Sequence, residues 1–97
     1  MKKKIAILGS TGSIGKSTFS IISQNKKKFE IIFLSTNKNY KEISKQCKIL
    51  KPKFIIINDK RTFLKFVKSN KKKIKVFNSY KGISLLKKKL DYTINAI

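Results

Sequence analysis

The sequence predicts an α/β fold, a doubly wound parallel sheet of about five strands with helices on both faces. Three observations predict it. Short apolar runs alternate with segments of helical periodicity along the 97 residues, as in consecutive βα units. There is no polar alternate face in the runs FEIIFLS and FIII, which is typical of strands buried between two layers of helices. A glycine-rich loop leads from the first apolar run directly into the first helical segment.

The first two elements flank the glycine loop. Residues 5–8 form a short apolar strand, and residues 13–24 have helical periodicity that ends at a polar turn. We expect the apolar face of this helix at three positions: Ile14, Ile21 and Ile22.

The next elements lead up to the only proline. Residues 29–35 predict a second strand, residues 36–39 a polar loop, and residues 40–50 a helix that ends before Pro52. Because a lone cysteine has no partner for an internal disulfide, Cys47 is expected to be a small core residue in a reducing compartment. It shares the inward face of its helix with two aliphatic side chains: Ile43 and Leu50.

Three more strands and two more helices complete the pattern. Strands are predicted over 54–57, 74–77 and 92–97, with helices over 60–69 and 80–90. The helix over 60–69 carries four apolar side chains: Phe63, Leu64, Phe66 and Val67. Right-handed crossovers leave few possible strand orders, and we expect the order 3-2-1-4-5. Because nothing follows the fifth strand to cover it, residues 1–97 are expected to be an incomplete N-terminal domain, truncated after that strand.

The chain is strongly basic, yet we do not interpret this as a nucleic-acid surface. There are 25 basic and 4 acidic residues, for a net charge of +21, which would ordinarily suggest nucleic acid. Twenty-four of the basic residues are lysines spread along the whole chain, whereas nucleic-acid contacts favour arginine. Isoleucine and asparagine are also abundant, as A/T-rich codons would produce. We therefore interpret the lysines as a solvated surface.

Several classes of protein are excluded by composition. No apolar stretch approaches the 18 or so residues that indicate a membrane span, and glycines interrupt the apolar run behind the basic N-terminus, which argues against a secretory signal. A cytoplasmic protein with no membrane partner is expected. Histidine is absent, which excludes imidazole metal ligands and histidine acid–base chemistry within this chain.

The loop GSTGSIG from Gly9 to Gly15 is the clearest functional motif. It is one residue longer than the G-x-G-x-x-G fingerprint of dinucleotide-binding, Rossmann-like folds. There Gly9 would turn out of the strand, Gly12 would admit a pyrophosphate, and Gly15 would let the helix pack on the sheet. Four residues are candidates for the phosphate contacts: Thr11, Gly12, Ser13 and Ile14.

Other interpretations stay open at this point. Gly15, Lys16 and Ser17 match the end of the P-loop pattern G-x-x-x-x-G-K-[ST], with Asp59 as the acid of a nucleotide kinase or NTPase, although the first glycine of that pattern falls at Ser10. The loop could also be a structural turn that binds nothing. A basic, non-enzymatic nucleic-acid-binding module is the remaining alternative.

The segment after the second strand indicates which dinucleotide would bind. NAD-binding sites carry an acid there for the ribose 2′-hydroxyl, but residues 35–39 contain none. Lys38 instead offers a positive charge to a 2′-phosphate, and a charge-assisted bond of this kind contributes about 1.5–3 kcal/mol. The sequence therefore predicts NADPH in preference to NADH.

The motif ILGSTGSIG, followed by Ser17 and Thr18, resembles the N-terminus of the 1-deoxy-D-xylulose 5-phosphate reductoisomerase family. Further matches are Lys38-Asn39, Gln46-Cys47 before Pro52, and the closing Asn95-Ala96-Ile97. The resemblance implies NADPH contacts around the pyrophosphate from the four loop residues named above. It also implies contacts to the adenosine ribose and its 2′-phosphate from three residues: Asn37, Lys38 and Asn39. The family usually has glycine at position 37, and asparagine tolerates a positive φ better than most residues.

The resemblance also implies what a complete family member does. It is an NADP-dependent oxidoreductase that isomerises 1-deoxy-D-xylulose 5-phosphate and reduces the product to 2-C-methyl-D-erythritol 4-phosphate in non-mevalonate isoprenoid biosynthesis. A divalent metal, Mg or Mn, and a homodimer are implied as well. The four acids of this chain form no cluster, and we assign no metal ligand and no catalytic residue within residues 1–97. By this resemblance the catalytic and C-terminal domains are absent, and with them the metal and the phosphorylated sugar site.

Overall fold

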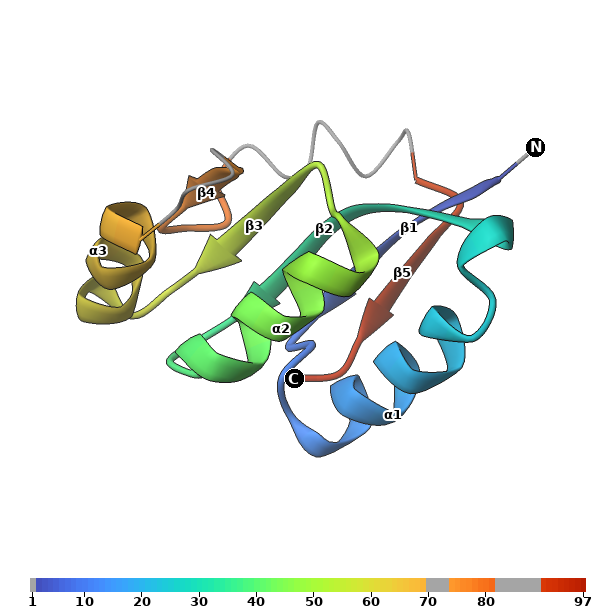
Figure 1. The fold of residues 1–97 in the computed structure, drawn as a ribbon, viewed down its shortest axis with the longest axis horizontal. Helices are drawn as coiled ribbons and strands as arrows, with labels where there is room; N and C mark the ends of the chain where they lie inside the picture. Colours follow the sequence, from blue (N-terminus) through green and yellow to red (C-terminus); the bar gives the residue numbers. More distant parts are fainter. Residues whose placement is uncertain (1, 70–73, 82–89) are drawn as a thin grey trace.

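A computed structural model describes residues 2–69, 74–81 and 90–97 (Figure 1). Its five strands are all parallel and form one sheet in the order β4-β3-β2-β1-β5. The strands are β1 Lys3–Leu8, β2 Phe29–Thr36, β3 Phe54–Ile57, β4 Lys75–Phe77 and β5 Tyr92–Asn95. The helices are α1 Ser13–Ser23, the short 3₁₀ helix η1 Lys26–Lys28, α2 Tyr40–Leu50 and α3 Lys60–Ser69. The predicted parallel α/β class is confirmed, and α2, β3 and α3 occupy the predicted residues.

The order of the strands differs from the predicted 3-2-1-4-5. The fourth strand lies outside β3, and β5 rather than β4 pairs with β1, with Ile5 opposite Tyr92 and Leu8 opposite Asn95. Strands that follow one another in the chain usually lie side by side in a sheet, and here β4 pairs directly with β3, with Phe54 opposite Lys75. The chain then returns to the free edge of β1. As a result, β1 lies between β2 and β5, and the loop that follows β1 is flanked by the ends of both.

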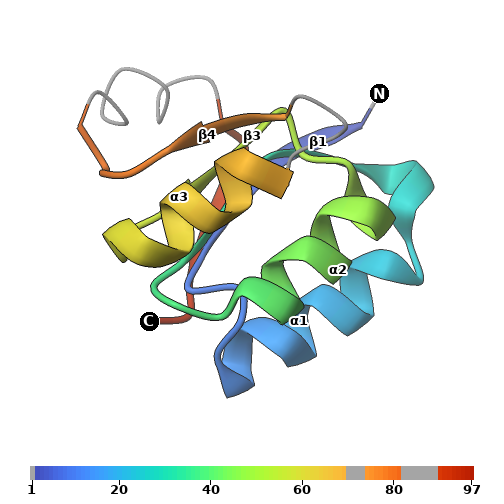
Figure 2. The same ribbon diagram turned by 60° about the vertical axis from the view of Figure 1, so that its left-hand side comes forward.

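All three long helices described cover the same face of the sheet (Figures 1 and 2). Their inward side chains join those of β1, β2 and β3 in one apolar core. A second cluster lies on the other face, around Phe33, Phe54 and Ile56, and is partly covered by Tyr80 and Leu90. The predicted helix over 80–90 would begin and end at those two residues, but 82–89 lie outside the described part of the chain.

The inward face of α1 agrees with the prediction at Ile22 but not at Ile14 and Ile21. Ile14 and Ile21 are 64% and 63% exposed, and the buried positions are Gly15, Phe19 and Ile22. These three are spaced as one helical face, and the face is set by the packing of Gly15 against the glycine loop. A hydrophobic pattern gives no weight to a glycine, so it places Ile14 rather than Gly15 on the inward face.

The other two helices agree better with the pattern. Ile43, Cys47 and Leu50 of α2 are buried as predicted, with the Cys47 thiol in the core. In α3 only Phe66 is buried and Phe63 packs at the edge of the core. The other two apolar side chains of this helix, Leu64 and Val67, are about half exposed. Among the described residues no helix has the length and apolar character to cross a membrane.

Candidate functional site

The glycine loop begins where β1 ends, at the carboxyl edge of the sheet (Figure 1). Gly9 has φ +73°, a backbone conformation that L side chains rarely adopt. A Cβ built on Gly9 would lie 2.9 Å from Cγ1 of Ile97, just beyond β5. The positive φ therefore favours glycine at this position, and the backbone of Ile97, 3.1 Å from such a Cβ, adds to the preference.

The end of β2 holds the start of the loop in place. Ser35 accepts from the N–H of Gly9 on its Oγ (2.9 Å) and from the N–H of Ser10 on its carbonyl (2.9 Å). Tyr80 donates its hydroxyl to the same Oγ at 2.8 Å. From α2, the buried amide of Gln46 donates to the carbonyl of Ser10 at 2.8 Å. Sequence reasoning missed these anchors, although a serine inside an apolar strand and a glutamine on an inward helix face are signals of buried hydrogen bonding.

The first turn of α1 presents amide groups that no side chain caps. Gly12 is the N-cap residue, in an extended conformation, and its N–H bonds to the carbonyl of Gly9 at 3.2 Å. The amides of Ser13 and Ile14 therefore lack both an intrahelical partner and a side-chain cap. All three residues are exposed, so these amides can bind an anion such as a phosphate.

The two remaining loop glycines serve different purposes. A Cβ on Gly15 would lie 2.3 Å from the carbonyl oxygen of Gly9 and 2.5 Å from the carbonyl carbon of Ser10. A Cβ on Gly12 would meet only ordinary contacts, at 3.6 and 3.8 Å. Gly15 is thus required by the packing of the helix on its own loop, whereas the fold itself does not require a glycine at position 12.

A second loop follows β2 and holds the other predicted site residues. The side chain of Asn39 caps α2 by accepting from the N–H of Glu42 at 3.1 Å. Lys38 is exposed, and its carbonyl accepts from the N–H of Tyr40 at 2.9 Å. Asn37 does not have a positive φ, so the glycine usual in the family is not required by the backbone here.

The structure brings the two loops together. Thr11 in the glycine loop shares a 2.6 Å hydrogen bond between hydroxyls with Thr36, the residue just before the second loop. Pairing of β1 with β2 places both loops at the same edge of the sheet. The candidate residues at 11–14 and 37–39 therefore lie at the same edge of the sheet, where the uncapped start of α1 and the exposed Lys38 both face solvent.

The groups that suggested a P-loop have other roles. The hydroxyl of Ser17 donates to the carbonyl of Ser13 within the helix, at 3.2 Å. Asp59 caps α3, since its Oδ2 accepts from the N–H of Thr62 at 3.0 Å and from its hydroxyl at 2.8 Å. These hydrogen bonds to Thr62, with the nearby charges of Lys38 and Arg61, hold the pKa of Asp59 below its ordinary 3.8.

Removing the Asp59 cap should lower stability in a pH-dependent way. Because its folded-state pKa is depressed, the carboxylate stabilises the fold above about pH 3.8, and this contribution is lost as pH falls through the lower folded value. Asp59→Ala should therefore lower the melting temperature by a few degrees at pH 7. Thermal melts at pH 7 and near pH 2 test this, and a difference from wild type that is unchanged at low pH would contradict it.

The acids of the chain are engaged separately. Among the described residues, no three histidine, cysteine or acidic side chains gather where they could hold a metal ion. Their partners are the Lys53 ammonium for Glu30 (3.3 Å), the Gln46 amide for Glu42 (3.0 Å), Thr62 for Asp59 and the Lys4 N–H for Asp91 (2.7 Å). The described residues thus do not fit a divalent metal site.

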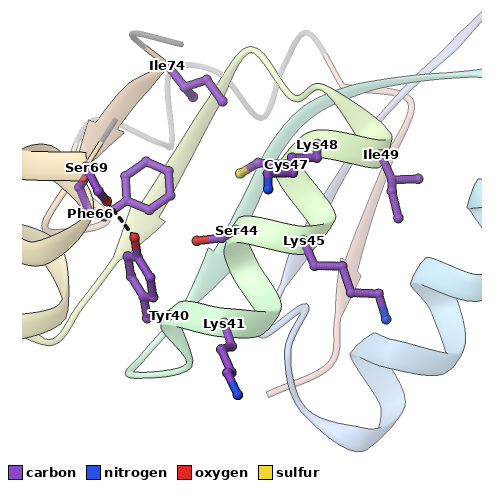
Figure 3. A pocket seen from close by; sticks show the side chains of 10 residues that line it. All are labelled: Tyr40, Lys41, Ser44, Lys45, Cys47, Lys48, Ile49, Phe66, Ser69 and Ile74. Atoms are coloured by element: carbon purple, nitrogen blue, oxygen red, sulfur yellow. Dashed lines mark hydrogen bonds between the residues drawn. The ribbon is translucent and has the colours of Figure 1, made fainter. Parts of the chain in front are cut away.

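A large hollow lies elsewhere, between α2 and α3 (Figure 3). Its volume is about 630 Å³, and its apolar lining includes Tyr40, Ile49 and Phe66. None of the candidate residues at 11–14 or 37–39 lines it. The chemistry-bearing surface is instead the open edge where the strands end, as expected for a sheet of this kind.

Together, the parallel sheet, the glycine loop and the lysine-bearing loop beside it define a Rossmann-like α/β fold, the class of fold in which dinucleotides bind at this edge of the sheet. A family model described as 1-deoxy-D-xylulose 5-phosphate reductoisomerase matches residues 5–97. The chain belongs to this family, which confirms the resemblance carried by its motifs. Nothing in these matches supports a P-loop NTPase or a nucleic-acid-binding module.

Individual relatives support the same family assignment. The reductoisomerase of Pelagibacter ubique (strain HTCC1062) is 44% identical over 99 residues, which cover 98% of this chain and 26% of the relative. The solved reductoisomerase from Zymomonas mobilis in complex with NADPH has a TM-score of 0.74 at 26% identity, covering 79% of this chain and 21% of that one. Another solved reductoisomerase, in complex with NADPH, fosmidomycin and magnesium, shares the fold with a TM-score of 0.63 at 21% identity, over 97% of this chain and 19% of that one. The chain spans about a quarter of the length of its curated relative.

Proposed function

We propose that this chain binds NADPH through its adenosine and pyrophosphate portions. The observation that carries the proposal is the hydrogen bond between Thr11 and Thr36, which joins the glycine loop before α1 to the last residue of β2, where the basic loop begins. The pyrophosphate would accept from the exposed amides of Ser13 and Ile14 and from the loop hydroxyls, with Gly12 leaving room for its approach. The ribose and its 2′-phosphate would contact three residues of the second loop: Asn37, Lys38 and Asn39.

We propose further that the whole protein of which this chain forms part converts 1-deoxy-D-xylulose 5-phosphate to 2-C-methyl-D-erythritol 4-phosphate, as a homodimer. Membership of the family supports this activity. NADPH supplies the hydride for such a reduction. In this proposal the described residues bind and orient the cofactor, and none of their acids is assigned to a metal. The magnesium in a related structure supports a metal site built by other parts of the protein.

The effect of Gly12→Ala tests the pyrophosphate site. Since a methyl group at position 12 has room within the fold, stability should change by less than about 1 kcal/mol, the scale of a lost N-cap preference. The methyl group would stand where the pyrophosphate approaches, so NADPH affinity should fall about tenfold or more, as for the loss of a charge-assisted hydrogen bond. Titration of NADPH fluorescence measures the affinity, and a thermal melt measures the stability.

The controls separate the outcomes. Ile21→Ala, on the exposed side of α1, alters the same helix away from the loop and should leave NADPH affinity unchanged. No saturable NADPH binding by the wild-type protein would overturn the proposed function. Wild-type affinity in Gly12→Ala would exclude a pyrophosphate close to that residue.

A further inference from the structure

The first turn of α3 is hydrogen-bonded directly to the loop proposed to bind the 2′-phosphate. Since β2 and β3 are paired up to Thr36 and Ile57, the segments that follow them run side by side. The N–H of Asp59 donates to the carbonyl of Asn37 at 3.0 Å, and the hydroxyl of Thr62 donates to the carbonyl of Lys38 at 3.4 Å. Residues from the end of β3 therefore border this loop, although more than 20 residues separate them from it in sequence.

Two cations lie at this border. Lys38 is in the loop itself, and Arg61 stands between Asp59 and Thr62, the two residues that are hydrogen-bonded to the loop carbonyls. The charges of Lys38 and Arg61 both lower the pKa of the Asp59 carboxyl, after the larger effect of its hydrogen bonds to Thr62. That carboxylate is already bonded to Thr62. Among the described residues neither cation forms an ion pair or a side-chain hydrogen bond, and both side chains are exposed. Their N–H donors are therefore free for a ligand.

Arg61 makes the net charge beside this loop positive. If Lys38 stood alone beside Asp59, the two charges would cancel and leave little attraction for an anion. Arg61 restores one net positive charge at this place. It is also the only arginine among the 25 basic residues, and its planar guanidinium can bind two phosphate oxygens at once, which an ammonium cannot.

We propose that Arg61 is a second specificity-determining residue for the 2′-phosphate of NADPH, acting from the start of α3 together with Lys38. Lys38 contributes the charge of its ammonium group from the loop after β2. Arg61, in the first turn of α3, contributes a planar guanidinium that can bind two phosphate oxygens. This inference rests on the proposed function, and it adds a position that lies outside both sequence motifs. NADH and AMP lack the 2′-phosphate and gain nothing from Arg61.

The test compares pairs of ligands that differ only at the 2′ position. Adenosine 2′,5′-bisphosphate and AMP are titrated by calorimetry at fixed ionic strength, and NADPH and NADH by fluorescence. Arg61→Ala should weaken the two 2′-phosphorylated ligands about tenfold, and AMP and NADH by less than about twofold. Arg61→Lys should recover part of the loss, because lysine keeps the positive charge but lacks the planar guanidinium that binds two phosphate oxygens. Lys68→Ala removes the same charge from the last turn of α3 and should leave all four affinities unchanged.

The results separate the inference from the proposed function beneath it. An unchanged ratio of NADPH to NADH affinity in Arg61→Ala, with a reduced ratio in Lys38→Ala, would overturn the role of Arg61 and leave NADPH binding in place. An equal loss in Arg61→Ala and Lys68→Ala would reduce the effect to general charge and also overturn the inference. A wild-type protein that binds neither NADPH nor the bisphosphate would overturn the proposed function itself, and the role of Arg61 with it.

Discussion

Replacing Gly15 with alanine is expected to destabilise the fold by about 3 kcal/mol or more, at the upper end of what overpacking costs. The added Cβ would lie 2.3 Å from the carbonyl oxygen of Gly9 and 2.5–2.6 Å from backbone atoms of Ser10. These neighbours are backbone atoms and have no rotamer by which to move away. Ser10 is also fully buried and bonded to Ser35 and Gln46, so the loop cannot shift without losing those hydrogen bonds.

Chemical denaturation measures this effect, with Gly12→Ala as the matched control. Both variants add one methyl group within the same loop and helix start, but only Gly15 lacks space for it. We expect a large fall in the denaturation midpoint for Gly15→Ala and a small change for Gly12→Ala. Similar stabilities for the two variants would mean that the close approach of α1 to its loop is not the reason for glycine at position 15.

Reversing the charge of Lys38 is expected to abolish the preference for NADPH. In Lys38→Glu a carboxylate replaces the ammonium beside the proposed 2′-phosphate, and the net charge of Lys38, Asp59 and Arg61 changes from one positive to one negative. NADPH affinity should fall roughly 100-fold, since the lost attraction alone contributes about 1.5–3 kcal/mol. NADH, which has no 2′-phosphate, should change by less than about threefold.

Parallel titrations of NADPH and NADH check this expectation. Lys27→Glu reverses an exposed lysine in η1, at the opposite end of β2, and controls for the change in total charge. Its NADPH preference should match that of wild type. Equal affinity of the wild-type protein for the two cofactors, or a preference that survives in Lys38→Glu, would show that the loop after β2 does not recognise the 2′-phosphate.

The parts of the fold that sequence predicted well depend on local patterns. The helix at Tyr40–Leu50 and the strand at Phe54–Ile57 were recognised because their periodicity, and the proline between them, lie within a few residues. On α1 the prediction holds for Ile22 but is wrong for Ile14 and Ile21, because the inward face is set by Gly15, which has no side chain to appear in a hydrophobic pattern. The strand order was wrong because pairing with the free edge of β1 is a contact between residues more than 80 positions apart.

The candidate site also contains residues that local motifs predict and residues that only contacts between distant elements reveal. The residues at 11–14 and 37–39 were predicted because a glycine loop and a missing acid are visible in a short stretch of sequence. Ser35, Gln46 and Tyr80 were not recognised as anchors of the loop, because each is a polar side chain whose partner comes from a different element. Nothing in the sequence near Arg61 indicates its place beside this loop, because the hydrogen bonds of Asp59 and Thr62 to the loop join residues more than 20 positions apart.

By itself, the sequence determined the parallel α/β class, most of the helices and strands, the family, and the two loops proposed to bind NADPH. Local periodicity and short motifs carry that information, because it depends on neighbours along the chain. Only the tertiary structure decided that β5 lies beside β1, that Gly15 rather than Ile14 faces inward, and that Asp59 and Arg61 border the loop after β2. Those facts depend on which distant segments pack together, and short stretches of sequence do not specify contacts between distant segments.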